Sequence, residues 1–286
     1  ADATALDAEY GRVVAAYRRG DVVTAVAEIA GWPEARIRSA RSGAKAKPDA
    51  LARTLAMVHT EAAFALRPDG RADRHLAAAD AYIDALPDQD ADGFIARWRV
   101  LAATYDVMLG RTTDAQARLG KARGKGPHSR HAELMLVALQ ELNLRRRING
   151  RVRDHAATFV GVPGTGVAVL AGVEAGRALV PAYGRLAEEY PDFLAARLRW
   201  GWALYINRSP NAKRPLETVA AQATRPDLRY LAFLFLGAVA ERDQRLDDAL
   251  RAYDSAVAAV PHQSALIGVL TVARATGNQA RAEQAT

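Results

Sequence analysis

The sequence predicts an all-α protein made of helical hairpins stacked in a row. Apolar residues recur at spacings of three and four through almost every segment between Gly and Pro, and strand patterns are nearly absent. Pro191, Pro226 and Pro261 follow one another at intervals of 35 residues. A fixed period of about 20 to 50 residues is typical of repeat proteins, in which each hairpin buries its apolar face against its neighbours.

The clearest repeat extends from Tyr230 to Pro261. In its first helix, Leu236 is followed by Gly237, whose bare backbone allows a neighbouring helix to approach closely. Its second helix carries three residues at spacings of four and three, which lie on one face: Ala249, Tyr253 and Ala256. This segment is therefore predicted to form one helical hairpin.

A second copy of the pattern starts at Trp98. Its first helix carries Trp98, Leu101, Ala102 and Tyr105. After a turn at Gly110, its second helix continues with Ala115, Leu119 and Ala122 before Pro127. The two copies support each other, because one is clearest in its first helix and the other in its second.

In residue type and spacing, these two copies resemble the tetratricopeptide repeat (TPR) family. The residues that match its signature are Trp98, Leu101, Ala102, Tyr105, Leu236, Gly237, Ala249, Tyr253, Ala256 and Pro261. Phe233 and Ala240 stand where the family has Trp and Tyr. The resemblance implies a right-handed α-α superhelix, here a TPR-like solenoid of about six or seven hairpins.

Weaker repeats fill the rest of the chain. One begins at Tyr10 and turns at 20–21, and another runs from Leu194 to Pro226. Leu179, Tyr183 and Leu186 are typical of the second helix of a further unit. Helices are expected over 49–66, 71–86 and 128–147, and irregular segments over 31–48 and 150–166. We predict a single solenoid domain over residues 1–286, with any hinge between subdomains near 150–166.

Residues typical of catalytic or metal sites do not form a convincing group. The chain has no Cys, so disulfides, thiolate metal sites and a Cys nucleophile are excluded. The loop 161–166 resembles the phosphate loop of AAA-type ATPases, but Val167 and Ala168 stand where Lys and Ser or Thr are required. Six histidines are scattered, and only His128 and His131 lie close, without a third ligand. We predict no catalytic residue, no cofactor and no metal.

Basic residues gather in two segments of a chain with a net charge of +7. They are Arg145, Arg146, Arg147, Arg151 and Arg153 in one segment, and Arg36, Arg38, Arg41, Lys45 and Lys47 in the other. Neither contains the interleaved aromatic residues expected where nucleic acid bases stack. We therefore expect these segments to be solvated helix ends. Polyanion or nucleic acid binding through them is kept as the second of two alternative functions.

In the TPR family, the first helices of the hairpins line a concave groove, and the resemblance carries this role onto matching positions. The candidate groove residues are Arg18, Arg19, Arg99, Asp106, Leu198, Trp202, Tyr205, Leu234 and Arg242. Trp202 and Tyr205 fit two interpretations equally, as anchors of a binding surface or as part of the core between repeats.

We therefore predict a non-enzymatic scaffold or adaptor that binds a peptide or protein partner along this groove. The alternative is a structural solenoid that stacks head to tail on copies of itself. No apolar run approaches the roughly eighteen residues needed to cross a bilayer. The start at Ala1, without an initiator Met, favours an exported chain, although a trimmed or cytoplasmic chain would begin in the same way.

Overall fold

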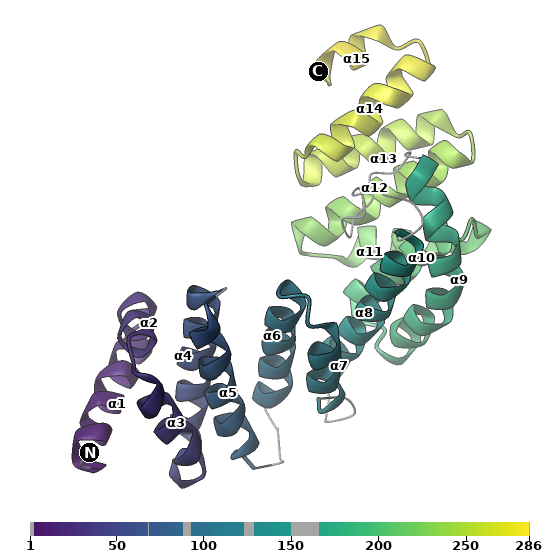
Figure 1. Cartoon of the computed structure of the whole chain (residues 1–286). Helices are drawn as coiled ribbons and strands as arrows, with labels where there is room; N and C mark the ends of the chain where they lie inside the picture. The colour runs from purple at the N-terminus through teal and green to yellow at the C-terminus, as the bar shows by residue number, and fades with distance from the viewer. Residues whose placement is uncertain (1–2, 68, 88–92, 123–128, 150–165, 286) are drawn as a thin grey trace. The chain divides into compact units, whose positions relative to one another are not determined.

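The computed structural model describes the backbone at residues 3–67, 69–87, 93–122, 129–149 and 166–285 (Figure 1). These residues form fifteen α-helices and two short 3₁₀ helices, with no strand among them. Helices that follow one another in the chain pack together, so the predicted all-α helical repeat is confirmed. The chain divides into two compact units, Ala1–Ala132 and Glu133–Thr286, each described by itself below.

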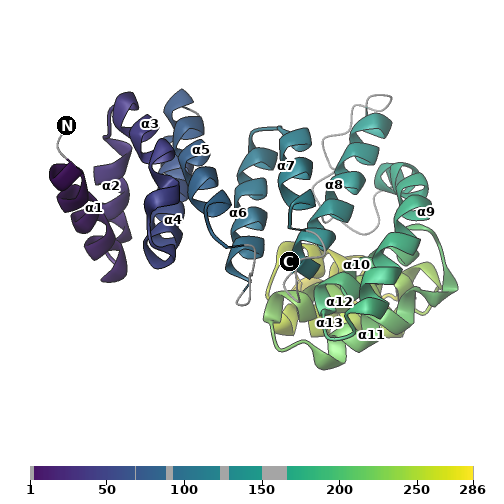
Figure 2. The ribbon, with the colours of Figure 1, turned by 90° about the horizontal axis from the view of Figure 1, so that it is seen from below.

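The N-terminal unit contains seven complete helices that follow one another in chain order (Figure 2). They are α1 (Ala3–Arg18), α2 (Val22–Ala30), α3 (Glu34–Ser42), α4 (Asp49–Leu66), α5 (Gly70–Asp84), α6 (Phe94–Met108) and α7 (Thr112–Gly120). Three hairpins are formed by α1 with α2, α4 with α5, and α6 with α7. Contacts of α2 and α6 with α4 join the hairpins to one another.

The turns of this unit have local causes in the sequence. Gly20 (φ +82°) and Gly110 (φ +76°) adopt the left-handed backbone that ends α1 and precedes α7, which a residue with a Cβ adopts only with strain. The Asp21 side chain then accepts a hydrogen bond from the Thr24 amide and caps the start of α2. Both turns lie where the sequence predicts them.

The segment 31–48 contains a helix, so the prediction of an irregular stretch there was wrong. Pro33 immediately precedes α3, and its fixed φ and missing N–H suit a helix start. Ile37 and Ala40 of α3 are buried, as is Ala44 of the 3₁₀ helix Ala44–Ala46, and α3 packs on α5. The Gly and Pro residues of this segment bound a short helix instead of preventing one.

The C-terminal unit continues the same pattern. Its boundary falls within α8 (Ser129–Asn149), and α9 (Gly166–Glu189) packs on α10 (Leu194–Ile206). The remaining helices are α11 (Lys213–Gln222), α12 (Pro226–Arg242), α13 (Leu246–Ala259), α14 (Gln263–Ala275) and α15 (Gln279–Gln284), with a 3₁₀ helix at Pro210–Ala212. Three further hairpins, α10 with α11, α12 with α13, and α14 with α15, bring the total among the described residues to six.

The first helices of these three hairpins are direct neighbours. Contacts join α10 to α12 and α12 to α14, in addition to the contacts within each hairpin. The signature residues Ala249, Tyr253 and Ala256 of α13 are buried together, and Gly237 of α12 lies against the Tyr253 ring. This packing places the three first helices on one side of the unit. The predicted hinge at 150–166 lies almost wholly outside the described residues.

Candidate functional site

Several of the predicted groove residues lie in the core instead of on an open surface. Leu198 and Trp202 of α10 are buried, and Leu234 of α12 is 0 % exposed. Leu234 packs in a cluster with Val269 of α14, because neighbouring first helices touch directly and fill the space between them. Of the two interpretations of Trp202, the structure therefore supports the core.

Tyr205 and Arg242 are brought together on the two neighbouring first helices α10 and α12. The Arg242 guanidinium lies over the Tyr205 ring, with its carbon 5.8 Å from the ring centroid. Its Nε donates a hydrogen bond of 2.8 Å to Asp243, and 24 % of the side chain is exposed. Burial, reinforced by the charge of Glu241, raises the pKa of Tyr205, so its hydroxyl stays neutral. We call these two residues the Tyr205–Arg242 patch.

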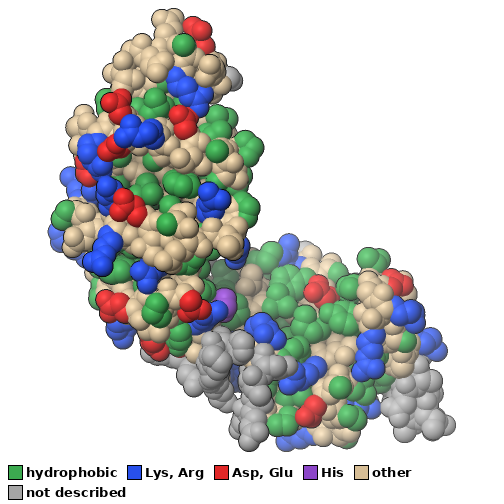
Figure 3. Space-filling view, turned by 180° about the vertical axis from the view of Figure 1, so that it is seen from behind, with side chains coloured by type: hydrophobic (Ala, Val, Ile, Leu, Met, Phe, Trp, Pro, Cys, Tyr) green, Lys and Arg blue, Asp and Glu red, His purple; other side chains and the backbone are tan. Residues whose placement is uncertain are grey.

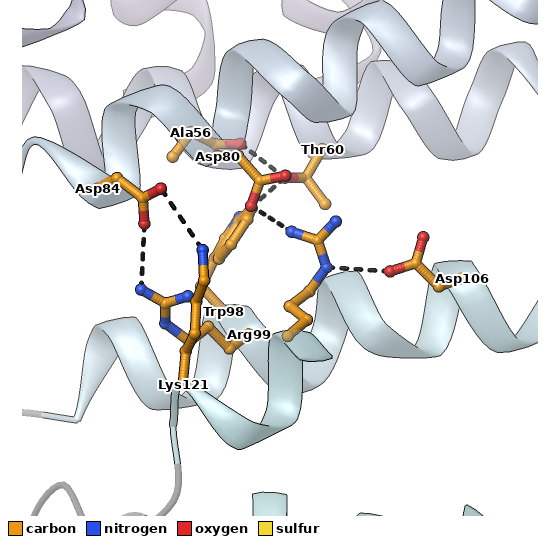
Figure 4. A network of polar contacts seen from close by, with 9 residues as sticks. Ala56, Thr60, Asp80, Asp84, Trp98, Arg99, Asp106 and Lys121 are labelled. Atoms are coloured by element: carbon orange, nitrogen blue, oxygen red, sulfur yellow. Dashed lines mark hydrogen bonds and ion pairs between the residues drawn. The ribbon is translucent and has the colours of Figure 1, made fainter. Parts of the chain in front are cut away.

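Arg99 and Asp106, predicted to face the groove from α6, take part in ion pairs between helices (Figure 4). Arg118 of α7 lies between two carboxylates: its Nε donates to Asp106 at 3.0 Å, and its Nη1 donates to Asp80 of α5. Burial raises the pKa of both carboxyls, although the Arg118 charge opposes this. The network joins α5, α6 and α7, which is a structural role.

A second part of this network involves Trp98, a signature residue of α6, and its neighbour Arg99 (Figure 4). Trp98 is buried, and its Nε1 donates to the Thr60 hydroxyl of α4 at 2.9 Å. Arg99 Nη2 donates to Asp84 at 3.2 Å, and the Lys121 ammonium lies 3.8 Å from the same carboxylate. Arg18 and Arg19, at the end of α1, are exposed.

Two of the basic residues of the segment 36–47 pack on buried aromatic rings, and Arg38, Arg41 and Lys45 are exposed. The Arg36 guanidinium lies 4.0 Å from the Trp32 ring centroid, and the Lys47 ammonium lies 5.2 Å from that of Tyr10. On the face of the C-terminal unit seen in Figure 3, basic and acidic side chains are interspersed. The other basic segment, with the Arg145–Arg147 side chains, Arg151 and Arg153, lies outside the described residues, as do His128 and the loop 161–165.

A pair of buried histidines was not predicted from the sequence motifs. His59 of α4 and His75 of α5 lie with their Nδ1 atoms 2.9 Å apart, although they are 16 residues apart in the sequence. The sequence does contain a signal for this pair. Residue 67, midway between the two histidines, lies in the turn between two predicted helices, so the two positions are equally far from the turn. Such positions face each other across a hairpin. In the part of the chain that the structure describes, no group of three or more His, Cys, Asp or Glu residues could hold a metal ion.

Comparison with known proteins adds no family or relative. No model of a known protein family matches the chain, and no curated protein matches it. Among the helices at the described positions, none combines the length and apolar character needed to cross a membrane.

Proposed function

We propose that this chain is a non-enzymatic scaffold of the tetratricopeptide type that binds a peptide or protein partner along the first helices of its hairpins. The observation that carries the proposal is the direct packing of α10, α12 and α14 in sequence order. A row of parallel elements offers one continuous surface, which is how repeat proteins bind extended partners. Burial of six residues that match the signature supports the proposal: Trp98, Ala102, Tyr105, Ala249, Tyr253 and Ala256.

The Tyr205–Arg242 patch is the best candidate anchor on this surface. Tyr and Arg are enriched among the residues that dominate binding energy at protein interfaces. Stacking of the guanidinium on the ring restrains Arg242 before a partner arrives, which lowers the entropy cost of binding. Because Leu198, Trp202 and Leu234 are buried, the surface offered to a partner is narrower than the groove predicted from the sequence.

The test is a pull-down from the native source with three forms of the full chain: the natural one, Arg242→Ala and Arg229→Ala. Arg229 is an exposed Arg on the same helix, so it is a matched control for the loss of one positive charge. We expect one protein to be recovered by the natural chain and by Arg229→Ala, and at least about tenfold less of it by Arg242→Ala, since about 1.4 kcal/mol changes affinity tenfold. If both variants recover equal amounts of the partner, the patch is not the anchor. If the natural chain recovers no specific protein, the scaffold function is refuted.

A second candidate, self-assembly, is favoured by exposed apolar side chains in the first hairpin. Val23 of α2 is 82 % exposed, and its neighbour Val22 is also exposed. Such a surface suits a copy of the chain that continues the stack head to tail. Light scattering over a range of concentrations tests this candidate: a natural chain that associates and a Val23→Ser variant that does not would support it. A natural chain that stays monomeric would exclude it.

A further inference from the structure

The core of the N-terminal unit contains a histidine pair that hydrogen-bonds only within itself. His59 and His75 are both 0 % exposed, and the 2.9 Å between their Nδ1 atoms is a hydrogen bond. One Nδ1 must carry a proton and the other must accept it, so the bond requires that at least one ring be neutral. Neither Nε2 atom has a hydrogen-bond partner. A proton added to the pair would therefore meet no acceptor.

Further aromatic rings pack on the His59 side of the pair. Tyr82 of α5 stacks on His59 with centroids 5.8 Å apart, and Trp32, between α2 and α3, meets His59 edge-on at the same distance. Tyr10 of α1 packs edge-on against Trp32 at 5.1 Å, and its hydroxyl lies 3.2 Å from that of Tyr82. We call these five rings the aromatic–histidine cluster. It joins the first hairpin, α1–α2, to the second, α4–α5.

The charged groups around the cluster are mainly cations. Arg36 of α3 lies over Trp32, and Lys47, just after the 3₁₀ helix, lies near Tyr10. Arg71 of α5 is close enough to His75 for its charge to oppose protonation. Among the acidic groups on the packed elements, Asp69 pairs with Arg71 at 2.9 Å, Glu28 of α2 with Arg12 at 3.4 Å and Glu34 of α3 with Arg74 at 2.9 Å. The charge of Glu61 of α4 acts on Tyr17 of α1.

Both imidazoles accordingly resist protonation while they remain buried. Burial lowers the pKa of His59 well below its usual value, and the neighbouring His75 lowers it further. Burial, followed by the charge of Arg71, lowers the pKa of His75 to about 4. In an opened state in water, both rings would regain the ordinary value of about 6.5.

We propose that the aromatic–histidine cluster is an acid-sensitive latch, which holds α1–α2 against α4–α5 near neutral pH and releases it as the solution approaches pH 5. The sign follows from linkage: below about pH 6.5 the opened state binds protons that the closed state does not, so acid favours opening. From His75 alone, opening should be favoured about 20-fold at pH 5 relative to pH 7. Because hairpins in a stack contact mainly their neighbours, α1–α2 can open without unfolding the rest.

Hydrogen exchange of the full chain, read by mass spectrometry at pH 7 and pH 5 and corrected for the intrinsic exchange rates, tests the latch. We expect amides of α1 and α2 to lose at least about 20-fold of their protection at pH 5, while those of α12 and α13 keep theirs. Unchanged protection of α1 and α2 would refute the proposal, and so would an equal loss in α12 and α13.

Two variants separate the histidine pair from other titrating groups. In a His59→Asn, His75→Asn chain, side-chain amides can replace the neutral hydrogen bond but do not titrate, so protection of α1 and α2 should no longer depend on pH. A His59→Leu, His75→Leu chain makes the same prediction if the first variant does not fold, because it removes both polar partners together. The control His262→Asn changes an exposed histidine of the C-terminal unit and should keep the natural response. A pH response retained in a folded double variant would overturn the proposal.

Discussion

A methyl group added at Gly237 should destabilise the C-terminal unit, because the Tyr253 ring already occupies the space. A Cβ at this position would lie 2.5 Å from Cε1 of Tyr253 and 2.6 Å from Cδ1. The ring cannot move away freely, since a Cβ at Gly268 of α14 would lie 2.8 Å from the same two atoms. The Tyr253 hydroxyl also donates a hydrogen bond of 2.8 Å to Glu241 of α12. The ring is thus held between α12 and α14.

The size of the effect follows from two opposing terms. In an unobstructed helix, replacing Gly by Ala stabilises by roughly 0.5–1 kcal/mol, because Gly loses more backbone freedom on folding. Overpacking a tight core costs about 1–3 kcal/mol, and the contacts here are far inside the optimum of about 3.5–4.0 Å between carbon atoms. For Gly237→Ala we therefore expect a net loss of about 1–2 kcal/mol in the free energy of unfolding.

Urea unfolding followed by far-UV circular dichroism measures this loss, and Gly11→Ala is the matched control. Gly11 lies within α1 with nothing within 4 Å of its added Cβ, so that variant should be slightly more stable than the natural chain. A double-mutant cycle with Tyr253→Ala then tests the cause, because Gly237→Ala should become neutral or stabilising once the ring is gone. A Gly237→Ala chain as stable as Gly11→Ala, or a loss that persists without the ring, would refute the reasoning.

Two further substitutions test the polar network of the N-terminal unit. Arg118→Met should lower the free energy of unfolding at pH 7 by about 3–5 kcal/mol, because two carboxylates lose the cation between them. The loss relative to the natural chain should shrink at pH 5. Burial raises the pKa of both carboxyls, and the variant lacks the Arg118 charge that opposes this, so its folded state takes up protons before its unfolded state does. An equal loss at both pH values would contradict this. Thr60→Val should cost about 1–3 kcal/mol in urea unfolding by leaving the Trp98 N–H buried without an acceptor. Thr54→Val, on the same helix and with the same type of bond to the preceding turn, should cost less; equal costs would contradict the role of Trp98.

Most of the helices could be predicted because their ends are marked by residues whose backbone conformation few other residue types can adopt. Gly20 and Gly110 adopt positive φ where the turns were expected, and the helix expected over 49–66 has those bounds. In contrast, α3 was missed because Gly31, Pro33 and Gly43 are typical of loops. A nine-residue helix shows too little periodicity to outweigh them, and its stability comes from packing on α5.

The candidate site was harder to predict, since a position on a first helix does not determine how far that side chain is from the next hairpin. Leu234 occupies a groove position by spacing, but close packing of α12 against α14 buries it. Arg99 was expected to meet a partner and instead bonds to Asp84 of the preceding hairpin. These outcomes depend on distances between helices, and the local sequence pattern contains no such distance.

The small residue of the first helix illustrates this limit. At the corresponding position of two repeats, Gly237 stands opposite the Tyr253 ring, whereas Ala102 belongs to a hairpin whose second helix carries Leu119. This pair suggests that a larger opposing side chain requires Gly, but at Gly201 an added Cβ would lie 2.7 Å from Cγ of Leu216. A Leu side chain therefore fills the space beside one of these Gly residues, although Leu is smaller than Tyr. The size of the opposing residue alone thus does not decide which small residue a position holds, so the repeat signature identifies a hairpin without fixing its packing distance.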